Sequence, residues 1–88
     1  LESLPDSIGN LTSLNELNLG YCHKLVSLPE RFGECKSLTS LDLQQCTSLV
    51  SLPERFGELT SLRYLLYCNY MPATLKVQLE NQGCYVGC

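Results

Sequence analysis

One ten-residue stretch occurs twice in this chain without a single change. Residues 25–34 read LVSLPERFGE, and the same ten letters return at residues 49–58. A weaker copy, LESLPDSIGN, occupies residues 1–10, one period upstream. A fixed period of roughly 20 to 50 residues is typical of repeat architectures, in which each unit packs on its neighbours. The period therefore restricts the fold more than any other property of the chain.

Each unit combines a short strand pattern with a return segment. Residues 14–22 follow the pattern Leu-x-x-Leu-x-Leu-x-x-Cys, and residues 38–46 repeat it. The alternation around Leu17 and Leu19 predicts a short strand with one buried face. In the first return segment, Pro5 suits the start of a turn and Gly9 its end, and the apolar residues are three or four apart, which favours a 3₁₀ or loose helical turn. Those apolar residues are Leu1, Leu4, Ile8 and Leu11.

A strand of about three residues cannot bury its apolar face alone. Stacking equivalent strands about 4.8 Å apart would give a hydrogen-bonded ladder and a continuous leucine core. Parallel strands need a long crossover, and the return segments supply it. The pattern therefore predicts a parallel sheet on one side of a stack and the return segments on the other.

Residues 71–88 depart from the period and allow two interpretations. Pro72 near a start, Leu75 and Leu79 four residues apart and Gly83 just past an end favour a helix over about 72–82. The alternation of apolar and polar residues from Ala73 to Glu80 would instead suit a strand. We expect the helix, followed by a last short strand at residues 84–86. In either form the segment would cap the end of the stack.

The full pattern, Leu-x-x-Leu-x-Leu-x-x-Cys-x-x-Leu-x-x-Leu-Pro-x-x-Phe-Gly-x-x-x-x-Leu, resembles the leucine-rich repeat family, and most of all the 24-residue units of plant disease-resistance receptors. The resemblance extends over residues 1 to about 67. It implies an α/β solenoid with parallel strands on a concave face and irregular or 3₁₀ return segments on a convex face. It also implies that Cys22 and Cys46 fill a slot that closes each turn with buried hydrogen bonds. Tyr70 does not match this slot, so the array should end there.

On this basis we expect leucine-rich repeats over residues 1–70, divided into units 1–24, 25–48 and 49–70. A shortened repeat and C-terminal cap should follow at 71–88. Because the chain starts in the middle of a repeat and without Met, we also interpret it as a piece of a longer protein.

The strongest candidate for a binding site is the concave face. Residues between and beside the inward leucines of each strand should face solvent. They form a polar, slightly acidic surface that carries two tyrosines, a residue type favoured in binding surfaces. The predicted partner-binding residues are Glu16, Asn18, Tyr21, Ser40, Asp42, Gln44, Gln45, Tyr64, Leu66 and Asn69, with Gly20 beside them.

Charge and hydropathy exclude several classes of partner. With six basic and nine acidic residues the net charge is −3, which disfavours nucleic acid and anionic membrane surfaces. No apolar run approaches the roughly 20 residues of a membrane span, so no membrane insertion is expected. The expected partner is a protein. The repeated pairs Glu30-Arg31 and Glu54-Arg55 are interpreted as a solvated surface rather than a docking ladder.

Neither catalysis nor a metal or cofactor is predicted. His23 is the only histidine, and a metal site needs three or four converging ligands. Carboxylates such as Glu16 and Asp42 would lie open to water, where nothing raises a pKa for acid–base work. The chain also has no nucleophile elbow or phosphate-binding loop.

The six cysteines indicate the compartment. Cys22 and Cys46 occupy the same slot of successive units, which favours buried thiols over bridges and hence a reducing, cytoplasmic location. The triplet Asn10-Leu11-Thr12 is an N-glycosylation acceptor that would matter only in a secreted protein. Cys84 and Cys88 could form a short disulfide, belong to a partial ligand set, or be unrelated thiols.

Two functions remain open at this point. The first is a protein-interaction module that holds a partner on its concave face. By resemblance to receptors, this module would be the sensing part of a larger chain. The second is a structural subunit whose open edges are covered by neighbours in an assembly.

Overall fold

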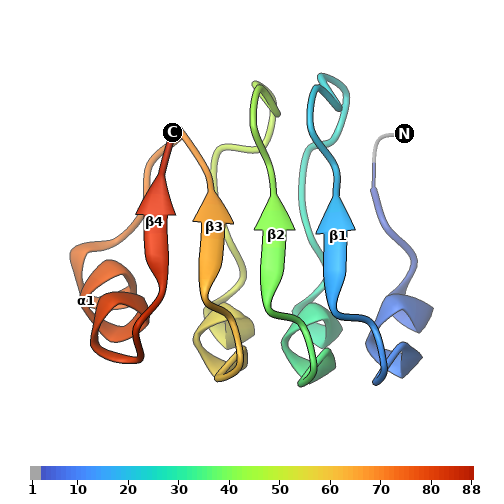
Figure 1. The fold of residues 1–88 in the computed structure, drawn as a ribbon. Helices are drawn as coiled ribbons and strands as arrows, with labels where there is room; N and C mark the ends of the chain where they lie inside the picture. Colours follow the sequence, from blue (N-terminus) through green and yellow to red (C-terminus); the bar gives the residue numbers. More distant parts are fainter. Residues whose placement is uncertain (1–2) are drawn as a thin grey trace.

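Four short strands pair in the order in which they occur along the chain, and all run in the same direction (Figure 1). The structure, a computed structural model, describes residues 3–88, so the predicted contribution of Leu1 lies outside the described residues. The strands are β1 (Glu16–Asn18), β2 (Ser40–Asp42), β3 (Tyr64–Leu66) and β4 (Tyr85–Gly87). A 3₁₀ helix, η1 (Asp6–Asn10), precedes β1, and two more, η2 (Glu30–Glu34) and η3 (Glu54–Glu58), lie between the first three strands. One α-helix, α1 (Ala73–Asn81), lies between β3 and β4.

The strand register reproduces the period of the sequence. Glu16 pairs with Ser40 and Ser40 with Tyr64, so each step along the sheet is one full period of the repeat. Tyr64 then pairs with Tyr85, so the last unit is shorter than the others. Each strand begins one residue earlier than the Leu17–Leu19 alternation suggested, although the Leu19 N–H still donates to the Asp42 carbonyl at 2.8 Å. The predicted parallel sheet with 3₁₀ return segments is confirmed.

The return segments stack closely on one another behind the sheet. Phe32 and Phe56, at equivalent positions of η2 and η3, are fully buried and stack with ring centroids 6.2 Å apart and planes 6° apart. A glycine follows each of these phenylalanines because no space remains there for a side chain. The sequence had instead suggested, for the equivalent Gly9, that glycine serves the geometry of the turn. A Cβ on Gly33 would lie 2.4 Å from the carbonyl oxygen of Arg55 in the next segment. Glycine therefore allows the direct contact of backbone with backbone between units.

The end of the stack is covered by α1, so the helix prediction for residues 72–82 is confirmed and the strand alternative is wrong. Leu79 is fully buried, and two glutamines on or next to the same helix bind backbone carbonyls of the third unit. Gln78 donates to the Gly57 carbonyl at 3.1 Å, and Gln82 donates to the Leu59 and Leu62 carbonyls at 2.9 and 3.0 Å. These side-chain amides therefore bind backbone carbonyls at the end of the stack, which a further repeat unit would otherwise have to cover. The predicted last strand follows as β4.

The leucine core is closed at the α1 end and more open at the other. Leu41 and Leu65, on β2 and β3, are fully buried, whereas the equivalent Leu17 on β1 is only partly buried. Leu11 is 48% exposed, whereas Leu59 at the equivalent position after η3 has no exposed surface. In Figure 1 the first return segment lies beyond β1 at the right of the sheet, with α1 at the opposite side. The first unit is therefore packed on one side only.

Candidate functional site

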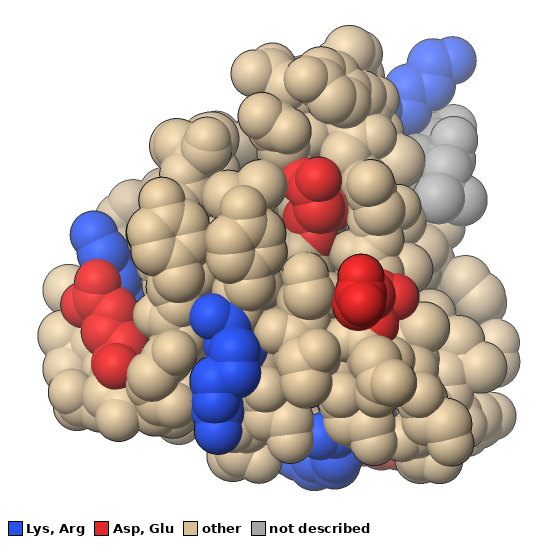
Figure 2. Space-filling model, viewed as in Figure 1, with Lys and Arg blue, Asp and Glu red and all other residues tan. Residues whose placement is uncertain are grey.

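Six of the predicted binding residues meet in one groove on the face of the sheet that α1 and the 3₁₀ helices do not cover. The groove has a volume of about 310 Å³. We call this the sheet groove, and its lining residues are Glu16, Leu17, Asn18, Ser40, Asp42, Tyr64 and Leu66. Figure 2 views this face and shows acidic atoms over the β1 and β2 part of it and basic side chains toward its lower edge.

The strand geometry explains why these side chains gather. Successive residues of a strand point to opposite faces, so a buried central residue leaves its two neighbours on the open face. In β2, Leu41 has no exposed surface while Ser40 and Asp42 are partly exposed. The in-register pairing places Glu16, Ser40 and Tyr64 in one row across the sheet and Asn18, Asp42 and Leu66 in the next.

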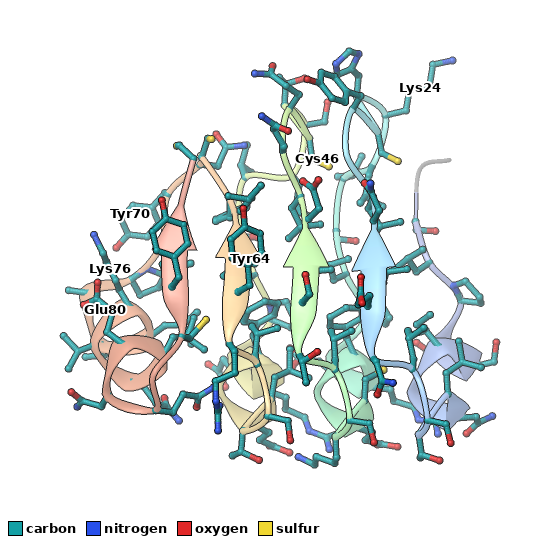
Figure 3. All side chains as sticks on the ribbon, in the orientation of Figure 1. Lys24, Cys46, Tyr64, Tyr70, Lys76 and Glu80 are labelled. Atoms are coloured by element: carbon teal, nitrogen blue, oxygen red, sulfur yellow. The ribbon has the colours of Figure 1, made fainter. Side chains whose placement is uncertain are left out.

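An aromatic pair borders the groove, and one of its members was not predicted. Tyr64 on β3 and Tyr85 on β4 stack with ring centroids 5.5 Å apart and planes 17° apart. Tyr64 is 43% exposed and Tyr85 59% exposed, so both rings present an edge or face to solvent. Figure 3 shows Tyr64 on β3 on the side of the sheet toward the viewer. The alignment of Cys84-Tyr85-Val86 with Arg63-Tyr64-Leu65 was the signal that could have found Tyr85.

Two of the groove residues also shape the loops that follow their strands. Asn18 Oδ1 accepts a hydrogen bond from the Gly20 N–H at 2.8 Å, and Asp42 Oδ1 accepts one from the Gln44 N–H at 2.8 Å. Such bonds from a side chain to a backbone N–H two residues later stabilise tight turns. Each turn ends in a residue in the left-handed region, Tyr21 at φ 64° and Gln45 at φ 61°.

Three predicted residues, Tyr21, Gln44 and Gln45, lie in these loops and do not line the sheet groove. Tyr21 is 63% exposed and contacts His23 edge-on, with ring centroids 6.3 Å apart. Gln45 contributes instead to a smaller hollow of about 120 Å³ beyond the strand ends. The structure therefore separates the predicted surface into a groove over the strands and a rim made by the loops.

Asn69 was expected to face solvent on the concave face, but its side chain points into the preceding loop. Its Nδ2 donates to the Leu49 carbonyl at 2.8 Å and to the Cys46 carbonyl at 3.3 Å. The Tyr67 hydroxyl donates to the same Leu49 carbonyl at 3.1 Å. In the unit before, Cys46 Sγ also donates to a carbonyl of the preceding unit, that of Leu19 at 2.9 Å. Asn69 thus connects the last loop to the preceding one, whereas Tyr70 at the cysteine position is 73% exposed.

On the opposite side of the molecule, charged residues of neighbouring return segments form a chain of ion pairs. Glu34 contacts Arg31 at 3.2 Å and Arg55 at 3.1 Å, and Arg55 also contacts Glu58 at 3.2 Å. Hydrogen bonds from Arg31 and then Arg55 hold the pKa of Glu34 below its ordinary value. Glu58 in turn contacts Lys36 at 3.4 Å. These side chains are solvated, so each pair contributes little to stability.

The thiols fall into different environments. Cys35, Cys46 and Cys84, hereafter the buried thiols, have pKa values raised by burial. Cys84 and Cys88 lie at opposite ends of β4, and four residues of extended chain span about 13 Å. A disulfide requires Cα atoms within about 7 Å. The predicted option of a Cys84–Cys88 bridge is therefore incompatible with β4.

No group of three or more His, Cys, Asp or Glu side chains among residues 3–88 is arranged to hold a metal ion. Within the same residues, no helix has the length and apolar character that crossing a membrane requires. The lining of the sheet groove includes two carboxylates, and the described contacts join no nucleophile to a base there. The groups it offers are charged, hydrogen-bonding and aromatic side chains.

Comparison with known protein families finds no family that matches this chain, and a search of curated proteins finds no similar sequence.

Proposed function

We propose that this chain is a protein-interaction module of the leucine-rich-repeat type, which holds an extended segment of a partner protein in the sheet groove. The observation that carries the proposal is the gathering of the predicted binding residues of three strands in one hollow on an otherwise uncovered sheet face. Such extended faces are the binding surfaces of solenoid proteins.

The repeat geometry supports the leucine-rich-repeat assignment. The strands keep the register of the repeat, the return segments are 3₁₀ turns, and Cys46 donates a buried hydrogen bond to the loop of the unit before it. These are the features that the resemblance implies for residues 1–70. The sensing part of a receptor would present its binding face in this way, with a larger chain supplying the response.

Charge and aromaticity indicate what the partner segment carries. Glu16 and Asp42 bring two carboxylates to neighbouring strands, and Tyr64 and Tyr85 offer stacked rings beside them. A guanidinium or ammonium group is attracted both to carboxylates and to the face of an aromatic ring. The proposed partner segment therefore places an Arg or Lys over β2, next to an apolar residue that packs on the tyrosine pair.

Selection from a random-sequence peptide library displayed on phage tests this proposal. We expect enriched peptides that contain Arg or Lys beside an apolar residue. For binding to one synthesised peptide, Tyr64→Ala should raise the Kd by about tenfold or more, as removal of an aromatic anchor does. Asp42→Asn should make the affinity for the peptide less dependent on salt concentration. Val50→Ala is the matched control, since Val50 is 60% exposed but does not line the groove.

Two results would reject the proposal. One is a selection that yields no specific peptide, and the other is a peptide whose affinity falls equally in the Val50→Ala and Tyr64→Ala variants. Thermal melts of both variants must accompany the titrations, because a loss of binding that follows a loss of folding says nothing about the groove.

A second candidate function, a structural subunit in a larger assembly, is favoured by the open side of the first unit. Leu11 is 48% exposed and Leu17 is only partly buried, and among residues 3–88 no strand pairs with the outer edge of β1. Here a partner subunit would add a strand beside β1 and cover these leucines. Sedimentation velocity distinguishes the two functions, because a stable monomer over a wide concentration range fits the module and concentration-dependent association fits the subunit.

A further inference from the structure

The six thiols of this chain differ sharply in accessibility. Cys35, Cys46 and Cys84 are buried and Cys22 is partly buried. Cys35 and Cys46 also donate to backbone carbonyls of the preceding unit, at 3.2 and 2.9 Å. Only Cys68 and Cys88 are exposed. A reagent in solution therefore reaches these two thiols first.

The two exposed thiols are also neighbours in space, although α1 and β4 lie between them in the sequence. Leu66 pairs with Gly87 at the ends of β3 and β4, and the Tyr67 N–H donates to the Gly87 carbonyl at 2.8 Å. Cys88 directly follows its paired end and Cys68 is the second residue after Leu66, and Cys88 Sγ approaches the Tyr67 carbonyl at 4.0 Å. Hydrogen bonding to the Cys88 side chain, followed by burial, raises the pKa of Cys68.

The spacing of paired strands is compatible with a bridge between these two cysteines. Adjacent strands lie about 4.8 Å apart, whereas a disulfide joins Cα atoms that are about 4.4 to 6.8 Å apart. Residues at or just beyond the same end of two paired strands fall near this range. Cys84, at the far end of β4, does not.

We propose that Cys68 and Cys88 form a redox-active dithiol, which a small disulfide such as oxidised glutathione converts into an intramolecular disulfide. One thiolate attacks oxidised glutathione, forms a mixed disulfide and releases one glutathione thiolate. The second thiol loses its proton and attacks the protein sulfur of this mixed disulfide, which releases the second glutathione. In total the protein loses two hydrogen atoms, and one oxidised glutathione becomes two reduced glutathione molecules.

The bridge would connect the loop that leaves β3 to the end of β4. The closed loop contains residues 68–88 and therefore all of α1, the helix that covers the stack. Closing a loop of this length restricts the unfolded chain, and the expected gain is a melting temperature about 15–20 °C higher in the oxidised form. The redox state of the surroundings would then set how firmly the cap is held, whatever partner the sheet groove binds.

Peptide mapping after oxidation tests this inference. The full chain is equilibrated in mixtures of oxidised and reduced glutathione, the remaining thiols are alkylated, and the protein is digested with trypsin. Cleavage after Arg63 and Lys76 separates residues 64–76, which contain Cys68, from residues 77–88, which contain Cys84 and Cys88. We expect a disulfide-linked pair of these peptides in which fragmentation places the bond on Cys88.

Variants give the control. Cys68→Ser and Cys88→Ser should each abolish the linked peptide and the rise in melting temperature, and because both residues are exposed the variants should fold. Cys22→Ser should leave both unchanged. Glutathione attached separately to Cys68 and Cys88 without a bond between them would overturn the proposal, and so would a bond that maps to Cys84. Oxidation with no change in melting temperature would overturn the proposed effect on the cap.

Discussion

Replacing each glycine of the repeated motif by alanine tests how directly successive units touch. Gly33 and Gly57 lie in identical ten-residue sequences and in equivalent 3₁₀ helices, η2 and η3. Neither has a left-handed backbone, so the local effect of the added methyl group is the same at both positions. Any difference between the two variants therefore reports on the neighbour that each glycine faces.

The neighbours differ in rigidity. A Cβ on Gly33 would lie 2.4 Å from the Arg55 carbonyl oxygen and 3.1 Å from its carbonyl carbon, both parts of the backbone. A Cβ on Gly57 would lie 2.8 Å from the Oε1 of Gln78, the end of a flexible side chain on α1. Restricting the unfolded chain favours alanine at both sites by about 0.5–1 kcal/mol. Overpacking against backbone costs about 1–3 kcal/mol, whereas moving Gln78 costs about 1 kcal/mol for its hydrogen bond to Gly57.

The expected outcome is a loss of about 1–2 kcal/mol of unfolding free energy for Gly33→Ala and almost none for Gly57→Ala. Urea unfolding followed by circular dichroism measures both, and the slope of the transition shows whether the two variants expose the same surface. In melting temperature the difference should be about 5–15 °C. Equal destabilisation of the two variants, or a greater loss for Gly57→Ala, would refute the argument that backbone contact between units decides the cost.

Three further predictions concern hydrogen bonding, burial and pH. Asn69→Ala should lower the unfolding free energy by about 1–2 kcal/mol because the Leu49 and Cys46 carbonyls lose a donor, whereas Gln45→Ala, one period upstream and exposed, should change it little in the same urea assay. Leu41→Ala should cost about 2–5 kcal/mol, and calorimetry should show a smaller loss for Leu17→Ala, since Leu17 is only partly buried. The pKa values of the buried thiols are raised above the ordinary 9.0, so as pH rises the unfolded chain loses these protons before the folded chain does. The stability present below pH 9.0 should therefore fall as pH rises toward the pKa values of the folded state. Urea midpoints measured between about pH 8 and pH 10.5 check this, and a constant midpoint would contradict it.

The sequence could predict the sheet because its determinants are periodic. Inward leucines such as Leu41 and Leu65 recur at one spacing, and a one-residue shift of register would turn them outward. The six groove residues follow from that alternation, since a strand with a known buried face has a known open face. The helix α1 could be recognised from its end signals at Pro72 and Gly83.

Predictions failed where a contact depends on a neighbouring unit that breaks the pattern. Asn69 lies one position before the cysteine slot and binds inward while Tyr70 is exposed, which a unit-by-unit alignment does not reveal. Tyr85 reaches the open face of the sheet beside Tyr64 because the last unit is shorter than the two before it. The proximity of Cys68 and Cys88 has the same origin, since it depends on where β4 pairs.

The one-sided packing of the first unit gives the molecule a direction in which it opens. Three amides make equivalent hydrogen bonds to the next strand: Leu19 to Asp42 at 2.8 Å, Leu43 to Leu66 at 2.9 Å and Tyr67 to Gly87 at 2.8 Å. Since the bonds are alike, any difference in their hydrogen-exchange rates measures the local opening of each unit. The stack should fray from β1 and remain closed longest where α1 covers it, so exchange should be fastest at Leu19 and slowest nearest the helix. Unfolding should therefore begin at β1 and reach the units beside α1 last.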